Sequence, residues 1–179
     1  MKNLVKPVIV LTVIAFICTA ALAGVNTLTK EIIAKAAAEK KAIAMQALFP
    51  EEQGFDALEI DAETLKKYNS SGVYKASSGK GYIVEVSASG YGGDIEMMVA
   101  FSNECDILGV KVVSHEETNG IGTRVVGDEK YLEKYVGKNA KEPSGIDAVS
   151  GATISSKAVL AGVNDAANLI TSAATAAED

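Results

Sequence analysis

The residues best suited to chemistry lie between Asp147 and Lys157, where small and hydroxyl-bearing side chains run directly into an expected helix. The unpaired N–H groups at a helix N-terminus carry a partial positive charge, which stabilises a phosphate group. Lys157 adds a full positive charge in the first turn, and Gly151 and Ala152 let another molecule approach the backbone closely. These residue types in this order therefore suit the binding of a phosphate.

The same hydroxyl groups also suit an ordinary helix start. Ser155 or Ser156 can be the N-cap of a helix that we expect from Ser155 to about Thr171. One face of this helix carries apolar residues at helical spacing. These residues are Val159, Val163, Ala167 and Ile170. Local physics alone leaves both interpretations open, a phosphate site and a plain cap.

A second candidate segment, His115 to Gly122, is longer than a tight turn needs and follows an expected strand. Gly120 and Gly122 flank Ile121, so this apolar side chain can lie against a flat ring, while Thr118 and backbone N–H groups bond the polar ring edges. The alternative is a plain surface loop, and a lone histidine is more often structural or exposed than catalytic. The segment is therefore a candidate for holding an aromatic ligand.

Composition and charge limit the possible partners. Hydrophobic residues make up 48% of the 179 residues, a share raised by the apolar N-terminal segment, and aromatic residues make up 6%. The net charge is −6, and residues 42–179 carry 11 basic and 21 acidic side chains, a formal charge of −10. Phosphate backbones and anionic lipid surfaces repel such a body, so we do not expect nucleic-acid binding.

The few cysteines and histidines limit metal chemistry. Cys18 lies in the apolar N-terminal segment and Cys105 lies far along the chain, so we expect no disulfide between them. The sequence has no Cys-x-x-Cys, and His115 is its only histidine. We therefore expect neither a zinc site nor an iron–sulfur cluster built by this chain alone.

The N-terminal segment has the length and composition of a membrane anchor. Val8 to Leu28 is a stretch of 21 residues without a charged side chain, long enough to cross the hydrocarbon core as a helix. Lys2 and Lys6 precede it, which favours an N-terminus in the cytoplasm. The alternative is a secretory signal peptide, because the Ala-Leu-Ala sequence that ends at Ala23 fits a cleavage site. Under both interpretations, the downstream domain is exported across the membrane.

Apolar spacing favours a retained anchor over a cleaved signal. Apolar residues recur at helical spacing beyond the possible cleavage site, which predicts one continuous helix to about Phe49-Pro50. The acidic, turn-prone segment from Pro50 to Asp61 then ends a stalk. We expect three parts: a cytoplasmic tip and transmembrane anchor, a helical stalk with a linker, and a folded domain. Their bounds are 1–28, 29–61 and 62–179.

The body shows the pattern of an α+β fold. We expect four strands separated by short breaks, which are typical of antiparallel hairpins. The strands are Val73–Ala76, Tyr82–Val86, Ile95–Phe101 and Ile107–Val113. The glycine-rich break at residues 89–93 is consistent with a flexible hairpin turn. Helices at 62–68, 128–135 and 155–171 pack on the resulting small antiparallel or mixed sheet.

The ordered series of segments is more specific than any one of them. After the N-terminal span come Gly81-Tyr82, Gly90–Gly93, Gly109–Val113, His115–Gly122, Tyr131–Lys138 and Asp147–Val159. This series resembles the FMN-binding domain of the G subunit of the Rnf electron-transport complex, which is related to the C subunit of the sodium-translocating NADH:quinone oxidoreductase. The resemblance covers nearly the whole chain, and the short length suits the Rnf protein better.

The resemblance implies one FMN per chain, bound covalently through its phosphate to Thr153, with no catalytic residue and no metal. It also implies that a separate flavin transferase installs the group from FAD. With the local chemistry, it points to a set of cofactor-binding residues in the two candidate segments. They are Ser150, Gly151, Ala152, Thr153, Ser155 and Lys157 in one, and Glu117, Thr118, Gly120, Ile121 and Gly122 in the other.

The loop departs from the family pattern at two positions. The family usually has Glu-Thr-Pro-Gly-Leu-Gly, whereas this chain has Asn119 in place of the Pro and Ile121 in place of the Leu. Isoleucine preserves an apolar contact with the ring. Loss of the proline leaves the loop less pre-organised, because proline fixes φ.

The function implied by the resemblance is electron transfer in a membrane complex. Such a complex couples ferredoxin:NAD oxidoreduction to translocation of Na⁺ or H⁺, and its other iron–sulfur and flavin subunits are the expected partners. We expect a single-pass protein of the cell membrane with its FMN domain on the extracytoplasmic side. The alternatives are a free-standing membrane-anchored flavin reductase or electron shuttle, for which His115 is the obvious acid–base candidate, and a binding module without a cofactor.

Overall fold

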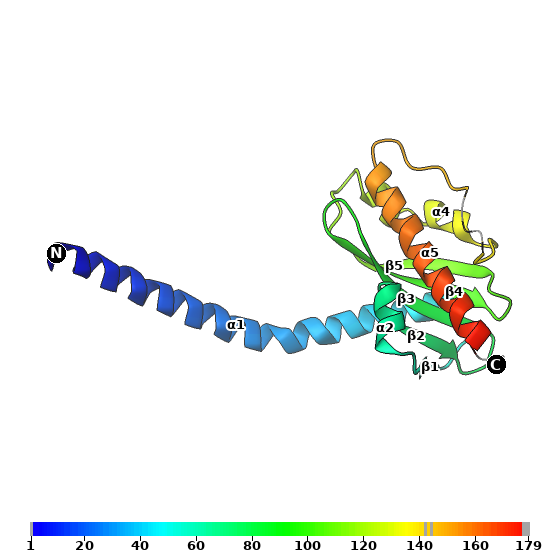
Figure 1. The fold of residues 1–179 in the computed structure, drawn as a ribbon, viewed down its shortest axis with the longest axis horizontal. Helices are drawn as coiled ribbons and strands as arrows, with labels where there is room; N and C mark the ends of the chain where they lie inside the picture. Colours follow the sequence, from blue (N-terminus) through cyan, green and yellow to red (C-terminus); the bar gives the residue numbers. More distant parts are fainter. Residues whose placement is uncertain (1, 142, 144, 177–179) are drawn as a thin grey trace. The chain divides into compact units, whose positions relative to one another are not determined.

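The fold is known from a computed structural model that describes residues 2–141, 143 and 145–176. The chain divides into two units, Met1–Lys41 and Ala42–Asp179. Figure 1 shows the order of the elements along the chain. The second unit contains the sheet and therefore positions the candidate site.

The first unit is part of one long helix, α1, which spans Lys2–Leu48 and confirms the prediction of a continuous helix to this point. It is long and apolar enough to cross a membrane, and it is the one such helix in the described part of the chain. Threonine hydroxyls within it donate to carbonyls one turn back, as Thr12 does to Val8 at 2.8 Å and Thr19 to Ala15 at 2.8 Å. These bonds satisfy the hydroxyl groups without water, as a membrane environment requires.

The second unit is built on a five-stranded antiparallel sheet with strand order β1-β2-β3-β4-β5. Each strand pairs with the next in sequence; short turns join β2 to β3, β3 to β4 and β4 to β5, whereas a short helix at residues 62–67 lies between β1 and β2. The bounds are β1 Phe55–Leu58, β2 Ser70–Ala76, β3 Gly81–Ser89, β4 Asp94–Ser102 and β5 Ile107–Ser114. Four of these strands confirm the predicted ones, and the α+β class is confirmed.

Strand β1 is missing from the prediction, which assigned residues 50–61 to an irregular end of the stalk. Phe55 to Leu58 pair with β2 in register from Phe55 opposite Ala76 to Leu58 opposite Val73. The Phe55 ring also packs on Phe49, with ring centroids 6.1 Å apart. These long-range contacts outweigh the turn-prone local sequence. The compact unit thus begins at Ala42 and takes in residues assigned above to the stalk and linker.

The helices of this unit are short except for the last. The elements are α2 Ala62–Lys67, α3 Thr123–Val126, α4 Glu129–Leu132, the 3-10 helix η1 Glu133–Tyr135, and α5 Thr153–Ala176. Helix α2 confirms the prediction. The single helix predicted at 128–135 is instead α4 followed by η1, and α3 was not predicted. Helix α5 begins two residues earlier than predicted and ends five residues later.

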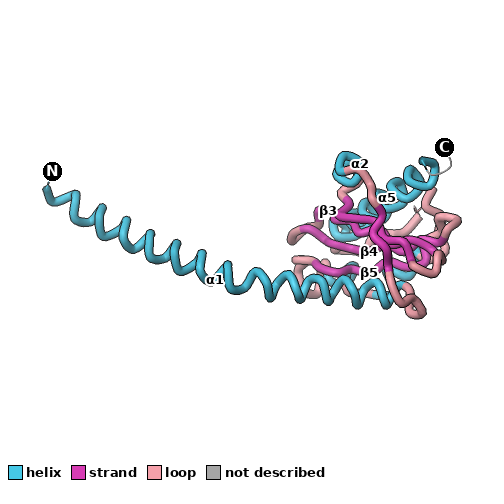
Figure 2. The backbone as a smooth tube through the Cα atoms, turned by 90° about the horizontal axis from the view of Figure 1, so that it is seen from below, coloured by secondary structure: helices cyan, strands magenta, loops and turns pink. Residues whose placement is uncertain are grey.

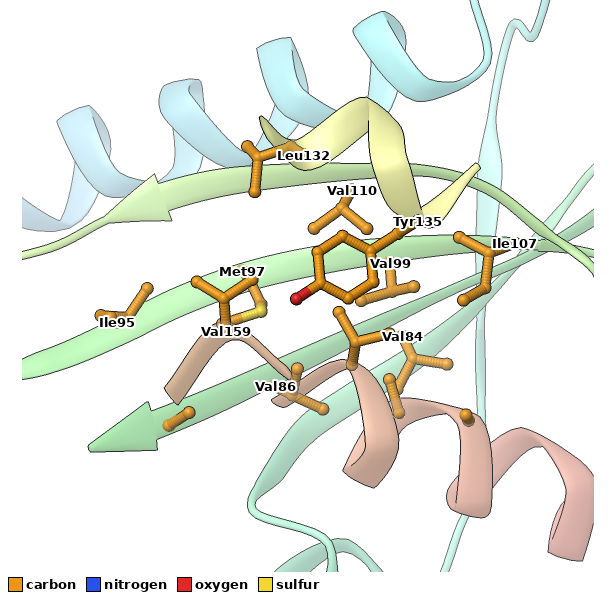
Figure 3. Close-up of a cluster of buried hydrophobic side chains, with 14 of the residues drawn as sticks. Val84, Val86, Ile95, Met97, Val99, Ile107, Val110, Leu132, Tyr135 and Val159 are labelled. Carbon is orange, nitrogen blue, oxygen red and sulfur yellow. The ribbon is translucent and has the colours of Figure 1, made fainter. Parts of the chain in front are cut away.

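The main core lies between α5 and one face of the sheet. The predicted apolar face of α5 is buried at Val159, Val163, Ala167 and Ile170. Figure 3 shows Tyr135 surrounded by apolar residues of the strands and of α5. The opposite face of the sheet is covered at Ile83, Met98 and Ala100 by the chain around Ala44 and Phe49. Figure 2 shows the strands between these two layers.

Candidate functional site

A tight turn leads into α5 and sets the position of Thr153. The Ala152 N–H donates to the Val149 carbonyl at 2.9 Å, and Gly151 has a φ of +81°. Only glycine adopts this backbone conformation without strain. Thr153 is then the first residue of α5, and its side chain is exposed. Within the described part of the chain, its hydroxyl makes no hydrogen bond.

The two serines that follow have other partners, so neither is the N-cap of the helix. Ser155 is buried and its hydroxyl donates to Glu117 Oε2 at 2.8 Å. The Ser156 hydroxyl is also buried; it accepts from the Val149 N–H at 3.0 Å and donates to the Ala152 carbonyl at 3.0 Å. The capping alternative is therefore wrong, since both serines lie inside the helix and fix the segments around its start.

The loop at residues 115–122 folds back on itself around one carbonyl. The Thr118 carbonyl accepts from the Ile121 N–H at 3.2 Å and from the Gly122 N–H at 3.0 Å. Gly120 has a φ of +78°, and its N–H donates to Thr123 Oγ1 at 2.9 Å. This compact turn leaves the Ile121 side chain 51% exposed. Local hydrogen bonds thus hold the loop that contains Asn119.

The two predicted segments meet at a cavity of about 390 Å³. Eight of the residues predicted to bind the cofactor line it. These are Glu117, Thr118, Ile121, Gly122, Gly151, Ala152, Thr153 and Ser155. The other three, Ser150, Lys157 and Gly120, do not line it. The tertiary structure therefore brings together two segments that are well separated in sequence, Glu117–Gly122 and Gly151–Ser155.

Two further residues line the cavity that were absent from the predicted site, Tyr91 and Ile154. Tyr91 comes from the glycine-rich loop between β3 and β4 and is 71% exposed, while Ile154 follows Thr153 and is 53% exposed. Exposed apolar side chains that form one contiguous patch can mark a binding site. With Ile121 they form the apolar rim of the cavity. A tyrosine inside a glycine-rich break was the one sequence signal that could have indicated Tyr91.

Charged groups around the cavity have defined places. The Glu117 carboxylate is 6% exposed and bonds the protein on both oxygens. Arg124 donates to the Ser150 carbonyl at 3.4 Å and so brings a positive charge to the turn before α5. His115 is exposed and does not line the cavity; its Nδ1 accepts from the Glu117 N–H at 3.3 Å. Among the described residues, no group of acidic, cysteine and histidine side chains could hold a metal ion.

The sequence matches two families over separate parts of the chain. Residues 90–168, which include every residue that lines the cavity, match the FMN-binding domain. Residues 1–48, which contain all of α1, match the RnfG N-terminal region.

Three relatives illustrate the similarity over most of the chain. The G subunit of an ion-translocating oxidoreductase complex from Haemophilus influenzae is 31% identical over 85% of this chain and 83% of its own length. The G subunit of a Na⁺-translocating ferredoxin:NAD⁺ oxidoreductase complex from Acetobacterium woodii is 29% identical over 91% of this chain and 89% of its own length. The G subunit of a proton-translocating counterpart from Clostridium ljungdahlii is 34% identical over 62% of this chain and 66% of its own length.

The cavity residues fit a flavin mononucleotide. The volume lies in the range of small-molecule sites, and the lining combines an apolar rim with a few polar groups. A side chain added at Gly151 would meet nothing within 4 Å, so the turn leaves open space beside the start of α5 for a phosphate. The ring and the phosphate thus have separate, chemically suitable surroundings.

Proposed function

This chain belongs to the RnfG family, the G subunits of the ion-translocating oxidoreductase (Rnf) complexes, and we propose that it carries one FMN covalently on Thr153 and transfers electrons within such a complex. The observation that carries the proposal is the exposed hydroxyl of Thr153 at the edge of the cavity, on the first residue of α5. Neighbouring Ser155 and Ser156 are buried and bonded elsewhere, so they do not compete for the attachment.

Thr153 is a tether in this proposal and not a catalytic group. A flavin transferase moves the FMN half of FAD to the hydroxyl: the bond between the two phosphates of FAD breaks, a Thr153 Oγ1–phosphorus bond forms, and AMP and a proton leave. The N–H groups at the start of α5 and the nearby Arg124 favour the negative charge of the resulting phosphodiester.

The remaining cavity residues orient and shield the ring. Bound FMN supplies the redox chemistry, and the protein supplies position and electrostatics. Ile121, Ile154 and Tyr91 present apolar surface at the rim and exclude water from that part of the cavity. Thr118 offers a hydroxyl to polar ring edges.

The rest of the proposal concerns the complex and the membrane. The relatives from Acetobacterium woodii and Clostridium ljungdahlii are named as subunits of ferredoxin:NAD⁺ oxidoreductases that translocate Na⁺ and protons, respectively. We infer an equivalent place for this chain among other redox subunits, anchored in the membrane by α1. Lys2 and Lys6 favour a cytoplasmic N-terminus, which puts the FMN domain on the extracytoplasmic side.

The test is Thr153→Ala in the full-length protein, made with a flavin transferase and compared with Thr171→Ala. Thr171 is the control, because it lies in the same helix but outside the cavity lining, and its hydroxyl donates to the Ala167 carbonyl at 2.7 Å. We expect Thr153→Ala to lose all in-gel flavin fluorescence and the control to keep it. Mass spectrometry of the wild-type protein should find the FMN adduct on the peptide that contains Thr153. Two results contradict the proposal. One is a peptide that contains Thr153 without the FMN adduct, isolated from a host with the transferase; the other is flavin fluorescence that survives Thr153→Ala.

A further inference from the structure

The Glu117 carboxylate joins three separate segments at the cavity. Its Oε1 accepts from the Tyr91 N–H at 2.7 Å and from the Gly92 N–H at 3.4 Å, both in the β3–β4 loop. Its Oε2 accepts from the Ser155 hydroxyl in the first turn of α5 at 2.8 Å. Glu117 itself lies in the 115–122 loop, so one side chain ties together all the segments that line the cavity.

The backbone is shaped to surround this carboxylate. A Cβ atom added at Gly90 would collide with Glu117 Oε1, and one added at Gly122 would collide with Glu117 Oε2. A Cβ atom at Gly92 would collide with the Glu116 carbonyl. Close approach of this kind requires glycine at these positions. Gly90 and Gly122, from two loops, thus make room for one buried charged group, and Gly92 makes room for the backbone next to it.

We propose that Glu117 is a positioning residue, which holds the β3–β4 loop and the first turn of α5 at the cavity by accepting hydrogen bonds, without itself bonding the flavin. Both of its oxygens already accept protein donors, and the side chain is 6% exposed. The consequence is that Tyr91, at the rim, and Thr153, two residues before Ser155, are fixed relative to each other. The part of the proposal that concerns flavin rests on the function proposed above.

Substitutions separate hydrogen bonding from charge. In Glu117→Gln, the amide oxygen can still accept from Tyr91 and Gly92, and the amide NH₂ can donate to the Ser155 hydroxyl, which accepts as well as donates. Glu117→Gln should therefore resemble the wild type although it has lost the charge. The Glu117→Asp side chain is one methylene too short to reach both partners, and Glu117→Ala removes every acceptor. These two variants should therefore lose the hydrogen bonds that join the β3–β4 loop to the start of α5.

Hydrogen exchange of the full-length protein without flavin measures directly whether the hydrogen bonds to Glu117 hold the loop. Because a lost hydrogen bond to a charged group costs about 1.5–3 kcal/mol, Glu117→Ala should raise exchange at Tyr91 and Gly92 roughly tenfold or more. Glu117→Asp should raise exchange at these two amides in the same way, and Glu117→Gln should leave it at the wild-type rate. Ser155→Ala removes only the Oε2 partner, so it should loosen the start of α5 and leave the Tyr91 amide protected.

Flavin attachment is the second measurement. With the transferase present, Glu117→Ala should take up flavin roughly tenfold more slowly than the wild type, and Glu117→Gln at close to the wild-type rate. Glu52→Ala is the matched control: Glu52 is also a buried glutamate that accepts from a loop, at Ser78, but it lies outside the cavity lining. It should raise exchange at Ser78 and leave flavin uptake unchanged.

Two results would overturn the assignment. Glu117→Ala with wild-type exchange at Tyr91 and Gly92 would show that the carboxylate does not hold the loop. Glu117→Gln as defective as Glu117→Ala would show that charge and not hydrogen bonding matters. A wild-type protein that takes up no flavin refutes the proposed function instead, and the positioning role is then decided by the exchange data alone.

Discussion

At the scale of single residues, neighbouring hydroxyl groups at the start of α5 have different roles. The Thr153 hydroxyl is exposed at the cavity, the Ser155 hydroxyl bonds a buried carboxylate, and the Ser156 hydroxyl holds the preceding turn. The difference follows from helical geometry, because successive residues point about 100° apart around the axis. Only the first of them faces the cavity with its hydroxyl unbonded, which is why it is the proposed point of attachment.

Gly151 gives a prediction at this scale. Its φ of +81° is strained for a residue with a Cβ, although a Cβ there would touch nothing within 4 Å. Gly151→Ala should therefore lower the free energy of unfolding by about 1 kcal/mol through backbone strain alone. Gly151→Asn is the control, since asparagine tolerates this conformation better and should cost less. Urea denaturation measures both, and equal costs would show that φ is not the cause.

At the scale of elements, the cavity depends on three connections that meet at one end of the sheet. The β3–β4 loop, the loop after β5 and the turn before α5 each contribute lining residues. Figure 1 shows the β3–β4 loop and the start of α5 at this end of the domain. The rigid sheet and α5 fix where these connections begin, and hydrogen bonds to Glu117 join two of them to the third. Loops held on a rigid scaffold are a common arrangement for binding sites.

The 3-10 helix η1 gives a prediction at this scale through Tyr135. Its side chain is fully buried, and among the described residues its hydroxyl has no hydrogen-bond partner. Burial raises the pKa of Tyr135 well above its ordinary value of 10.0. Tyr135→Phe removes an unpaired polar group and keeps the ring, so it should stabilise the protein by about 1 kcal/mol. Tyr135→Leu loses the ring and should destabilise it by a few kcal/mol.

The same tyrosine predicts an alkaline limit. With its pKa raised in the folded state, Tyr135 keeps a proton that the unfolded chain loses above about pH 10. Stability should therefore fall as the pH rises above this value, and it should fall less in Tyr135→Phe. Chemical denaturation between pH 8 and 11 measures the difference. Identical pH profiles, or a loss of stability in Tyr135→Phe at pH 7, would mean that the hydroxyl has a partner.

At the scale of the whole molecule, the charge is distributed unevenly between the two units. Residues 42–179 carry a formal −10, whereas residues 1–41 are basic. Some of the acidic side chains are stabilised in their charged form. The Ser78 hydroxyl lowers the pKa of Glu52, Thr64 lowers that of Asp61, and Lys111 lowers that of Glu129. Each contributes stability that requires an ionised carboxylate.

These carboxylates predict an acid limit. A lowered pKa in the folded state gives stability above the unfolded-state value, 4.5 for Glu52, which is lost as the pH falls through the folded-state pKa. Urea midpoints measured from pH 7 to pH 3 should therefore decline. Ser78→Ala should reduce this decline, because it removes the main cause of the shift. Ser172→Ala, which removes a hydroxyl that donates to the Leu169 carbonyl at 2.8 Å, should leave the profile unchanged.

The sequence by itself determined the long N-terminal helix, four of the five strands, the apolar face of α5 and two of the three segments that line the cavity. These are local properties, since periodicity, glycine placement and the order of motifs are visible without contacts. Only the tertiary structure decided that Phe55–Leu58 is a strand, that Tyr91 and Ile154 reach the cavity, and that Ser155 bonds Glu117. Each of these depends on residues brought together from distant positions, and local periodicity does not show which distant residues meet.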